Sequence, residues 1–155
     1  MKHLMISIAA LALCANAWAE EPFAGTWKLN LAKSKFPAGT APKEETFVIR
    51  EIAGGQVEQT TNGTATDGKP IALKRTVNQA GGVWKYQLGG PPAGTMGVVL
   101  KISSREAYNT VYVNEKMVSQ EHDTLSGDGK ELHAVVKGVD PQGKAFEITV
   151  VADRQ

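Results

Sequence analysis

The stretch FAGTWKLNL, residues 23–31, decides the fold. Its odd positions are apolar or glycine, and its even positions from Thr26 onward are polar. This alternation is typical of a β-strand that buries one face. Trp27 lies on the apolar face, so we expect it to be the largest side chain of the core.

The rest of the chain has the composition of short strands joined by tight turns. Its 155 residues suffice for one domain with a substantial core. Runs rich in Val, Thr and Ile recur between Gly, Pro, Asp and Asn residues, at roughly ten residues per strand and turn. The sequence therefore predicts an all-β fold, a single antiparallel meander barrel of about eight to ten strands. The first and last strands would close it and so remove the sheet edges.

The N-terminal segment predicts export. Lys2 is followed by an apolar run at residues 4–15 and by Ala17-Trp18-Ala19, the pattern of a cleavable signal peptide. The apolar run is too short to span a membrane. We expect residues 1–19 to be removed after Ala19, which leaves a barrel domain of residues 20–155 in the periplasm or outside the cell.

Composition excludes several classes of function. The only cysteine, Cys14, lies in the predicted signal peptide, so the mature domain would have neither a thiol nucleophile nor a disulfide. The 17 basic and 16 acidic residues nearly balance, which removes the usual footprint of nucleic-acid binding and of polybasic membrane adsorption. We expect a monomer without a cofactor, a nucleic-acid partner or membrane insertion.

Turn chemistry predicts how the C-terminal strands pair. The turn at residues 140–144 has Gly at its left-handed position, which puts Val139 opposite Ala145. The same logic applied to residues 126–130 puts Leu125 opposite Glu131. With a two-residue turn at 114–115, it predicts which residues of the strand between the two turns face inward. In these registers Asn109, Gln120, His122 and Thr124 face inward, whereas His133 faces outward.

The inward polar group has two interpretations, and both stay open. The polar atoms could satisfy one another or a buried water inside a filled barrel. Alternatively, they could be the few directed contacts of a mostly apolar ligand cavity. In the second interpretation the candidate ligand-binding residues are His122, Gln120, Asn109, Trp84 and Tyr86.

Catalytic and metal sites find little support. His122 and His133 are predicted on opposite faces, so they would not share a metal ion. No nucleophile elbow or phosphate-binding glycine loop is present. We assign no catalytic residue and no metal ligand, and keep hydrolysis or isomerisation at His122 only as a minor alternative.

Two connections could carry contacts. Residues 31–45 form a basic connection that would be either a solvated loop or a lid over the barrel mouth. Residues 89–94, GGPPAG, would form a long exposed loop, because neither Pro nor Gly supports a strand ladder.

Both ends of the domain carry a family resemblance. Residues 23–29 resemble the opening strand of the calycin superfamily, the lipocalins and fatty-acid-binding proteins, which carries F-x-G-x-W. Residues 150–155, VVADRQ, resemble the last strand of those proteins, where an Arg packs over that Trp. With KSKF at residues 33–36, the chain looks closer still to small secreted bacterial lipocalin-like proteins of undefined function. The resemblance implies that Gly25, Trp27 and Arg154 close the barrel.

The expected function follows from the barrel. Residues 31–45 are too short and too rich in Pro and Gly for the helical pair of a fatty-acid-binding protein, so the fatty-acid-binding Arg and Tyr set of that family is not carried over. We expect an exported, non-enzymatic binding protein that holds a small apolar or amphipathic molecule inside the barrel. The alternative is a filled barrel that acts through protein contacts at the cell envelope.

Overall fold

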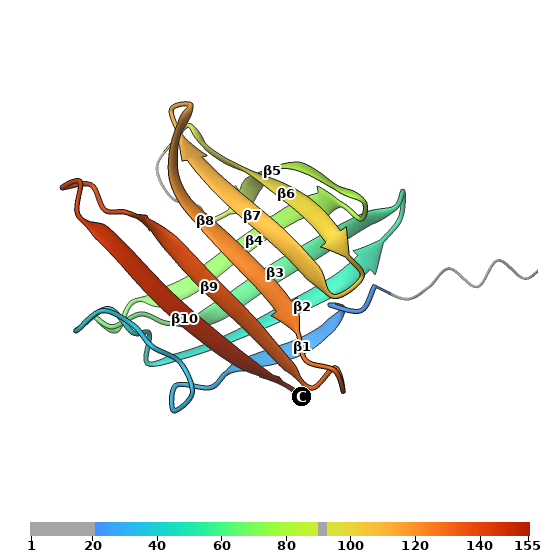
Figure 1. The fold of residues 1–155 in the computed structure, drawn as a ribbon, viewed down its shortest axis with the longest axis horizontal. Coiled ribbons are helices and arrows are strands. Elements are labelled where there is room, and N and C mark those ends of the chain that lie inside the picture. Colours follow the sequence, from blue (N-terminus) through green and yellow to red (C-terminus); the bar gives the residue numbers. More distant parts are fainter. Residues whose placement is uncertain (1–20, 90–92) are drawn as a thin grey trace, which may run out of the picture.

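The computed structural model describes residues 21–89 and 93–155, which form ten antiparallel strands (Figure 1). The predicted signal peptide and part of the predicted Gly-Pro loop lie outside the described residues. The strands are β1 (Gly25–Leu29), β2 (Glu44–Ile52), β3 (Gln56–Thr64), β4 (Pro70–Asn78), β5 (Gly81–Leu88), β6 (Thr95–Ser103), β7 (Glu106–Val113), β8 (Lys116–Leu125), β9 (Glu131–Val139) and β10 (Ala145–Arg154).

The strands form one closed meander. Each strand pairs with the next one in the chain, and β1 also pairs with β10 (Figure 1). Closure leaves no long edge strand on which another chain could add. The predicted all-β antiparallel barrel is confirmed. No helix among the described residues is long and apolar enough to span a bilayer.

Trp27 stands at the closing seam between β1 and β10. Its side chain is fully buried, and its backbone pairs with Arg154 of β10 and Phe47 of β2. The indole Nε1 donates a hydrogen bond of 2.9 Å to the carbonyl oxygen of Phe23. Trp27 therefore joins both neighbouring strands and the segment that precedes β1.

Arg154 covers the same indole. Its Cζ lies 4.3 Å from the Trp27 ring centroid, which is a cation–π distance. Its guanidinium also donates to the carbonyl oxygens of Pro22, Ala24 and Gly129. A Cβ on Gly25 would lie 2.7 Å from a guanidinium nitrogen, and Gly25 has a φ of +144°, so this position requires glycine. The Arg-over-Trp packing that the resemblance implied is present.

The apolar core gathers around Trp27 at one end of the barrel. The Trp27 and Phe47 rings stack with their centroids 6.4 Å apart. The cluster contains residues from both ends of the domain, so the core is complete only when the first and last strands are paired. Its buried members are Phe23, Trp27, Phe47, Leu125, Leu132 and Ala152, with Ile49 packed against them.

The last hairpin pairs as the sequence predicts. Val139 is opposite Ala145, and the register continues unbroken to Asp153. Gly143 closes the turn by donating its N–H to the Asp140 carbonyl oxygen at 2.9 Å, with a φ of +81°. The inward face of β9 and β10 is therefore the apolar one that alternation indicates.

The preceding hairpin does not pair as predicted. Leu125 lies opposite Leu132, one residue away from the expected partner Glu131. The reason is the length of the turn: Ser126 N–H bonds to the Glu131 carbonyl oxygen, which leaves residues 127–130 between them. The turn at 140–144 leaves only three residues between its closing pair. One additional loop residue shifts the whole pairing by one.

The pairing of β7 with β8 is also shifted. The two-residue turn is present, because Asn114 and Glu115 both have positive φ and Val113 is opposite Lys116. A β-bulge follows next to Val111, which moves every later pair by one residue. Both shifts change the pairing of β8. The residues that were predicted to face inward on this strand therefore face outward, and those predicted outward face inward.

The connection between β1 and β2, residues 30–43, contains most of the predicted basic connection 31–45 and runs beside β10. Lys35 forms a β-bridge with Thr149, and the Ser34 hydroxyl accepts a hydrogen bond of 2.9 Å from the Val151 N–H. Most of its side chains are exposed. Residues 30–43 do not line the interior cavity described below, whereas Glu45, the last residue of the predicted connection, lies in β2 and does. The lid interpretation stays a prediction.

We predict that Trp27→Ala lowers the free energy of unfolding by about 3 to 5 kcal/mol, because it removes the largest side chain of the core and the surface on which Arg154 packs. Urea denaturation measures the change. Lys28→Ala is the matched control: Lys28 is the next residue of β1 and is exposed, so its substitution should change stability by less than about 0.5 kcal/mol. A loss below about 1 kcal/mol in Trp27→Ala would contradict the closing role.

Candidate ligand-binding cavity

The inside of the barrel is hollow. A cavity of about 190 Å³ lies between the apolar core and the middle of the barrel. A second hollow of about 260 Å³ lies on the far side of a shared polar layer. The residues common to both spaces are Glu45, Gln59, Arg75, Asn109 and Glu121.

A relay of hydrogen bonds crosses this layer on three strands. Trp84 of β5 donates its indole N–H to Oδ1 of Asn109 at 2.9 Å. Asn109 of β7 in turn donates from Nδ2 to Oε2 of Glu121 on β8 at 2.8 Å. Trp84 and Asn109 are both buried. The relay therefore fixes the amide orientation of Asn109 and holds the Glu121 carboxylate toward the cavity.

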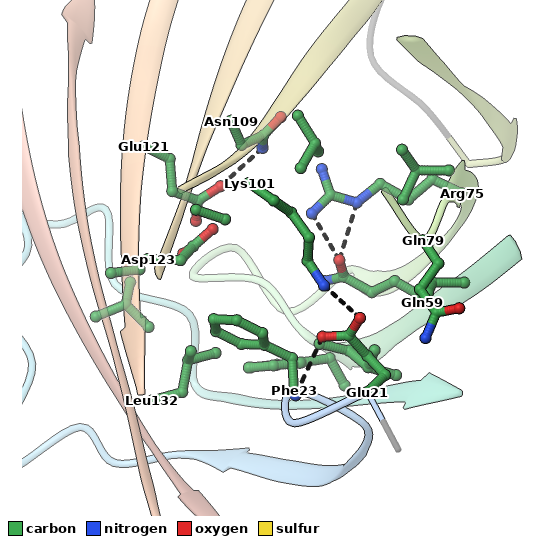
Figure 2. A pocket seen from close by; sticks show the side chains of 18 of the residues that line it. Glu21, Phe23, Gln59, Arg75, Gln79, Lys101, Asn109, Glu121, Asp123 and Leu132 are labelled. Atoms are coloured by element: carbon green, nitrogen blue, oxygen red, sulfur yellow. Dashed lines mark hydrogen bonds and ion pairs between the residues drawn. The ribbon is translucent and has the colours of Figure 1, made fainter. Parts of the chain in front are cut away.

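Arg75 of β4 lies on the opposite wall from Glu121 (Figure 2). Its guanidinium donates twice to Oε1 of Gln59, at 2.9 and 2.6 Å, and stacks 4.6 Å above the Trp84 ring centroid. Tyr86 meets Trp84 edge to face at 4.9 Å. The Arg75 guanidinium therefore contacts a neutral amide and an aromatic ring. It forms no ion pair with Glu45 or Glu121, the carboxylates of the layer.

Space for Trp84 depends on one glycine. Trp84 pairs across the strands with Gly97 of β6, and a Cβ at position 97 would lie 2.3 Å from the indole ring. No real Cβ makes contacts that short, so a larger residue would push Trp84 out of the relay. Gly97 thus positions a side chain of the site although it has none itself.

Besides Glu21, three carboxyl groups face this interior, those of Glu45, Glu121 and Asp123. Burial, and then the Glu121 carboxylate, raise the pKa of Glu45. The same two causes raise the pKa of Asp123 well above its usual range, with Arg75 opposing them. Strands β2 and β8 are not neighbours in the sheet, so Glu45 and Glu121 act on each other across the lumen. The cavity keeps like charges close together in a poorly solvated space.

The segment before β1 closes one end of the cavity. Glu21 is only 3% exposed, forms an ion pair with Lys101 of β6, and accepts a hydrogen bond from the Phe23 N–H (Figure 2). Its own N–H donates to Oε1 of Glu51 at 2.5 Å. Phe23 contributes its ring to the apolar core. Glu21 and Lys101 thus satisfy each other at the floor of the cavity.

Three of the predicted site residues lie inside the barrel. Asn109 lines the cavity, Tyr86 lines the second hollow, and Trp84 is buried behind Asn109. Their role in binding a ligand stays a prediction. The sequence pattern located them because β5 and β7 alternate regularly over these positions.

The other two, Gln120 and His122, were placed on the wrong face. Because of the bulge next to Val111 and the longer turn after β8, both lie on the outer wall. His122 stacks on Tyr108 at 4.4 Å between ring centroids and bonds to Glu106 at 2.8 Å. Gln120 lies opposite Thr110 and Lys137. Neither residue contacts the cavity.

Sequence reasoning missed most polar residues of the interior, among them Glu45, Gln59, Arg75, Glu121 and Asp123. Alternation gives a signal for some of them, since Glu45 precedes Phe47 and Ile49 on one face of β2, and Arg75 stands between Leu73 and Val77 on β4. Glu121 and Asp123 follow directly once β8 is given its true register.

The histidines provide no catalytic centre in the cavity. His122 and His133 both lie on the outer wall, contrary to the prediction of opposite faces, and each is paired with a glutamate. Within the described part of the chain, no group of three His, Cys, Asp or Glu side chains could hold a metal ion. A reaction at His122 would therefore lack the barrel interior as its binding site.

Comparison with solved structures supports the fold. The chain is similar to the fluorescent protein UnaG, with a TM-score of 0.61 and 15% identity over 87% of this chain and 98% of that one. It is also similar to Rv2717c from M. tuberculosis, with a TM-score of 0.52 and 16% identity over 86% of this chain and 93% of that one. The fold is that of a calycin-like β-barrel. No protein-family model and no curated protein matches the sequence.

We predict that the raised pKa of Asp123 makes stability fall with rising pH. The folded state holds the Asp123 proton more tightly than the unfolded chain does. This proton therefore adds its full share to the free energy of unfolding below about pH 4, and that share is lost as the pH rises through the pKa of Asp123 in the folded state. Relative to Asp123→Asn, the wild type should lose up to about 1.4 kcal/mol per pH unit within that window. Urea denaturation at several pH values measures both proteins, and parallel profiles would contradict the shift.

Proposed function

We propose that this protein is an exported, non-enzymatic binding protein that holds a small, partly apolar molecule inside its barrel. The observation that carries the proposal is the hollow interior. The cavity of about 190 Å³ combines an apolar wall with a few converging polar groups, which is the usual composition of a ligand site. A filled barrel would have side chains in this space.

The size of the cavity limits the ligand. Pockets for drug-sized molecules run from roughly 300 to 1,000 Å³, so the 190 Å³ space suits a smaller molecule or one that extends into the second hollow. The apolar part of such a molecule would lie against Phe47, Val99 and Leu132. Its polar end would meet the layer that contains Asn109 and Glu121.

The fold is compatible with this proposal. Barrels of about eight to ten strands have an interior just wide enough for side chains or one small ligand. A shared fold does not by itself imply a shared function. The argument therefore depends on the cavity of this chain and on the groups that line it.

Contact with an envelope protein is a second candidate, favoured by one feature of the outer wall. Val83 of β5 and Leu100 and Ile102 of β6 are all more than half exposed. Exposed apolar groups gathered on one sheet face are a feature of protein interaction sites. A protein that co-purifies with the barrel would support this candidate.

Native mass spectrometry of the protein purified from its own host tests the binding function. We predict a retained small-molecule adduct in the wild type and in His122→Ala, because His122 lies on the outer wall. Ala134→Phe should lose the adduct, since Ala134 is buried in the lining of the cavity. Circular dichroism checks folding, because overpacking costs about 1 to 3 kcal/mol. An empty wild type, or equal retention in Ala134→Phe, would contradict the proposal.

Export is tested on the same preparation. The pattern at residues 1–19 predicts a mature chain that begins at Glu20. N-terminal sequencing of protein from the periplasmic or culture fraction should therefore read Glu-Glu-Pro-Phe. A chain that keeps residues 1–19 and stays with the cytoplasmic fraction would contradict export and would leave the cavity argument unaffected.

A further inference from the structure

We propose that the cavity selects a molecule with a protonated amine on an apolar body, and that the amine binds between Glu121 and Asp123. This inference rests on the proposed function, because it names the chemical class that the same cavity would take. It is carried by the balance of charges around the cavity and by the partners that each charge already has.

The cavity lining has more acidic than basic side chains. Lys101 is paired with Glu21 at the floor. Arg75 is directed to Gln59 and Trp84 on the far wall. Among the described residues, no ion pair joins either cation to the remaining carboxyl groups. The acidic residues of the lining are Glu21, Glu45, Glu121 and Asp123, and the basic ones are Arg75 and Lys101.

Asp123 is the least satisfied of these groups. It lines the cavity, and none of the described residues forms a hydrogen bond or an ion pair with its carboxyl group. Glu121 has only one oxygen engaged, by the amide of Asn109. Among the described residues no buried side-chain polar atom lacks a partner, so the unpartnered oxygens of Asp123 are accessible from the cavity. When they are ionised, the carboxyl oxygens of Glu121 and Asp123 that have no protein partner can accept hydrogen bonds from a ligand that brings donors.

The spacing of the two carboxyl groups suits an ammonium. Glu121 and Asp123 are two residues apart on β8 and therefore lie on the same face of the strand, about 7 Å apart along it. An ammonium has three donors and no acceptor, so it can bond to both groups from a position between them. Figure 2 shows both carboxyl groups on the β8 wall of the cavity, whose lining also includes Leu132 and Ala134. Apolar side chains are thus available to the rest of the molecule.

The same geometry disfavours an anionic ligand. A carboxylate placed at this wall would face Glu45, Glu121 and Asp123, while Arg75 is held on the opposite wall by Gln59. Burial, and then the Glu121 carboxylate, raise the pKa values of Glu45 and Asp123, and for Asp123 the Arg75 charge opposes them. A bound amine would favour the ionised carboxyl groups, so binding should release protons from the cavity.

The first test compares three probes with one apolar body by isothermal titration calorimetry near neutral pH. These probes are 2-phenylethylamine, 2-phenylethanol and 3-phenylpropionate. The amine should bind at least roughly ten-fold more tightly than the alcohol, because a hydrogen bond to a charged group is the stronger one. The propionate should bind most weakly. Titrations in buffers of different ionisation enthalpy should show proton release with the amine alone.

Variants locate the amine. Asp123→Asn and Glu121→Gln keep the shape of each side chain, and each should lower the affinity for the amine by roughly ten-fold while changing that for the alcohol by less than about two-fold. Glu147→Gln is the matched control, because Glu147 pairs with Lys137 on the outer wall. It should bind all three probes as the wild type does.

The outcomes separate this inference from the proposed function. Equal or tighter binding of the alcohol or the propionate, or unchanged amine affinity in Asp123→Asn, would overturn the amine inference and leave a binding barrel. If none of the probes binds at millimolar concentration and the native protein is empty, the proposed function fails and the amine inference fails with it. If Asp123→Asn does not fold, the probe comparison and proton release in the wild type still decide the inference.

Discussion

The barrel depends on the contact between Trp27 and Arg154 at the seam of its first and last strands. The indole fills the end of the interior, and the guanidinium covers it while donating to three backbone carbonyl groups. A meander of this kind has two edges until those strands meet. Gly25 leaves the space that the guanidinium needs. One contact therefore couples core formation, closure of the sheet and the position of both ends of the domain.

The apolar core fills one end of the barrel, and polar side chains line its middle. The apolar cluster around Trp27 fills its own end, and beyond it the lining changes to carboxyl, amide and guanidinium groups. The relay from Trp84 through Asn109 fixes Glu121, and the pair of Glu21 with Lys101 closes the floor. The stability of the seam permits an interior in which Glu45, Glu121 and Asp123 form no ion pair with a described residue, an arrangement that is costly for folding and useful for binding.

The identity of the residues in the candidate site depends on the register of one strand, β8. Strands β5, β7, β9 and β10 face as their alternation indicates, which correctly put Asn109, Trp84 and Tyr86 inside. On β8 a bulge and a longer turn each shift the pairing by one residue. Because side chains alternate with a period of two, His122 moved to the outer wall and Asp123 to the cavity. The polar interior was predicted, but its chemistry changed from imidazole to carboxyl groups.

The sequence by itself determined the all-β class, the meander order, the turns at 114–115 and 140–144 and the seam, because alternation, glycine positions and terminal motifs are local signals. It also placed Asn109 of β7 inside the barrel, whereas the residues of β8 that it placed inside lie on the outer wall. Only the tertiary structure decided which residues of β8 face the interior, and that Arg75 is held by Gln59 instead of a carboxylate. The physical reason is that a bulge, a loop length and a contact across the lumen are set by how distant strands fit together.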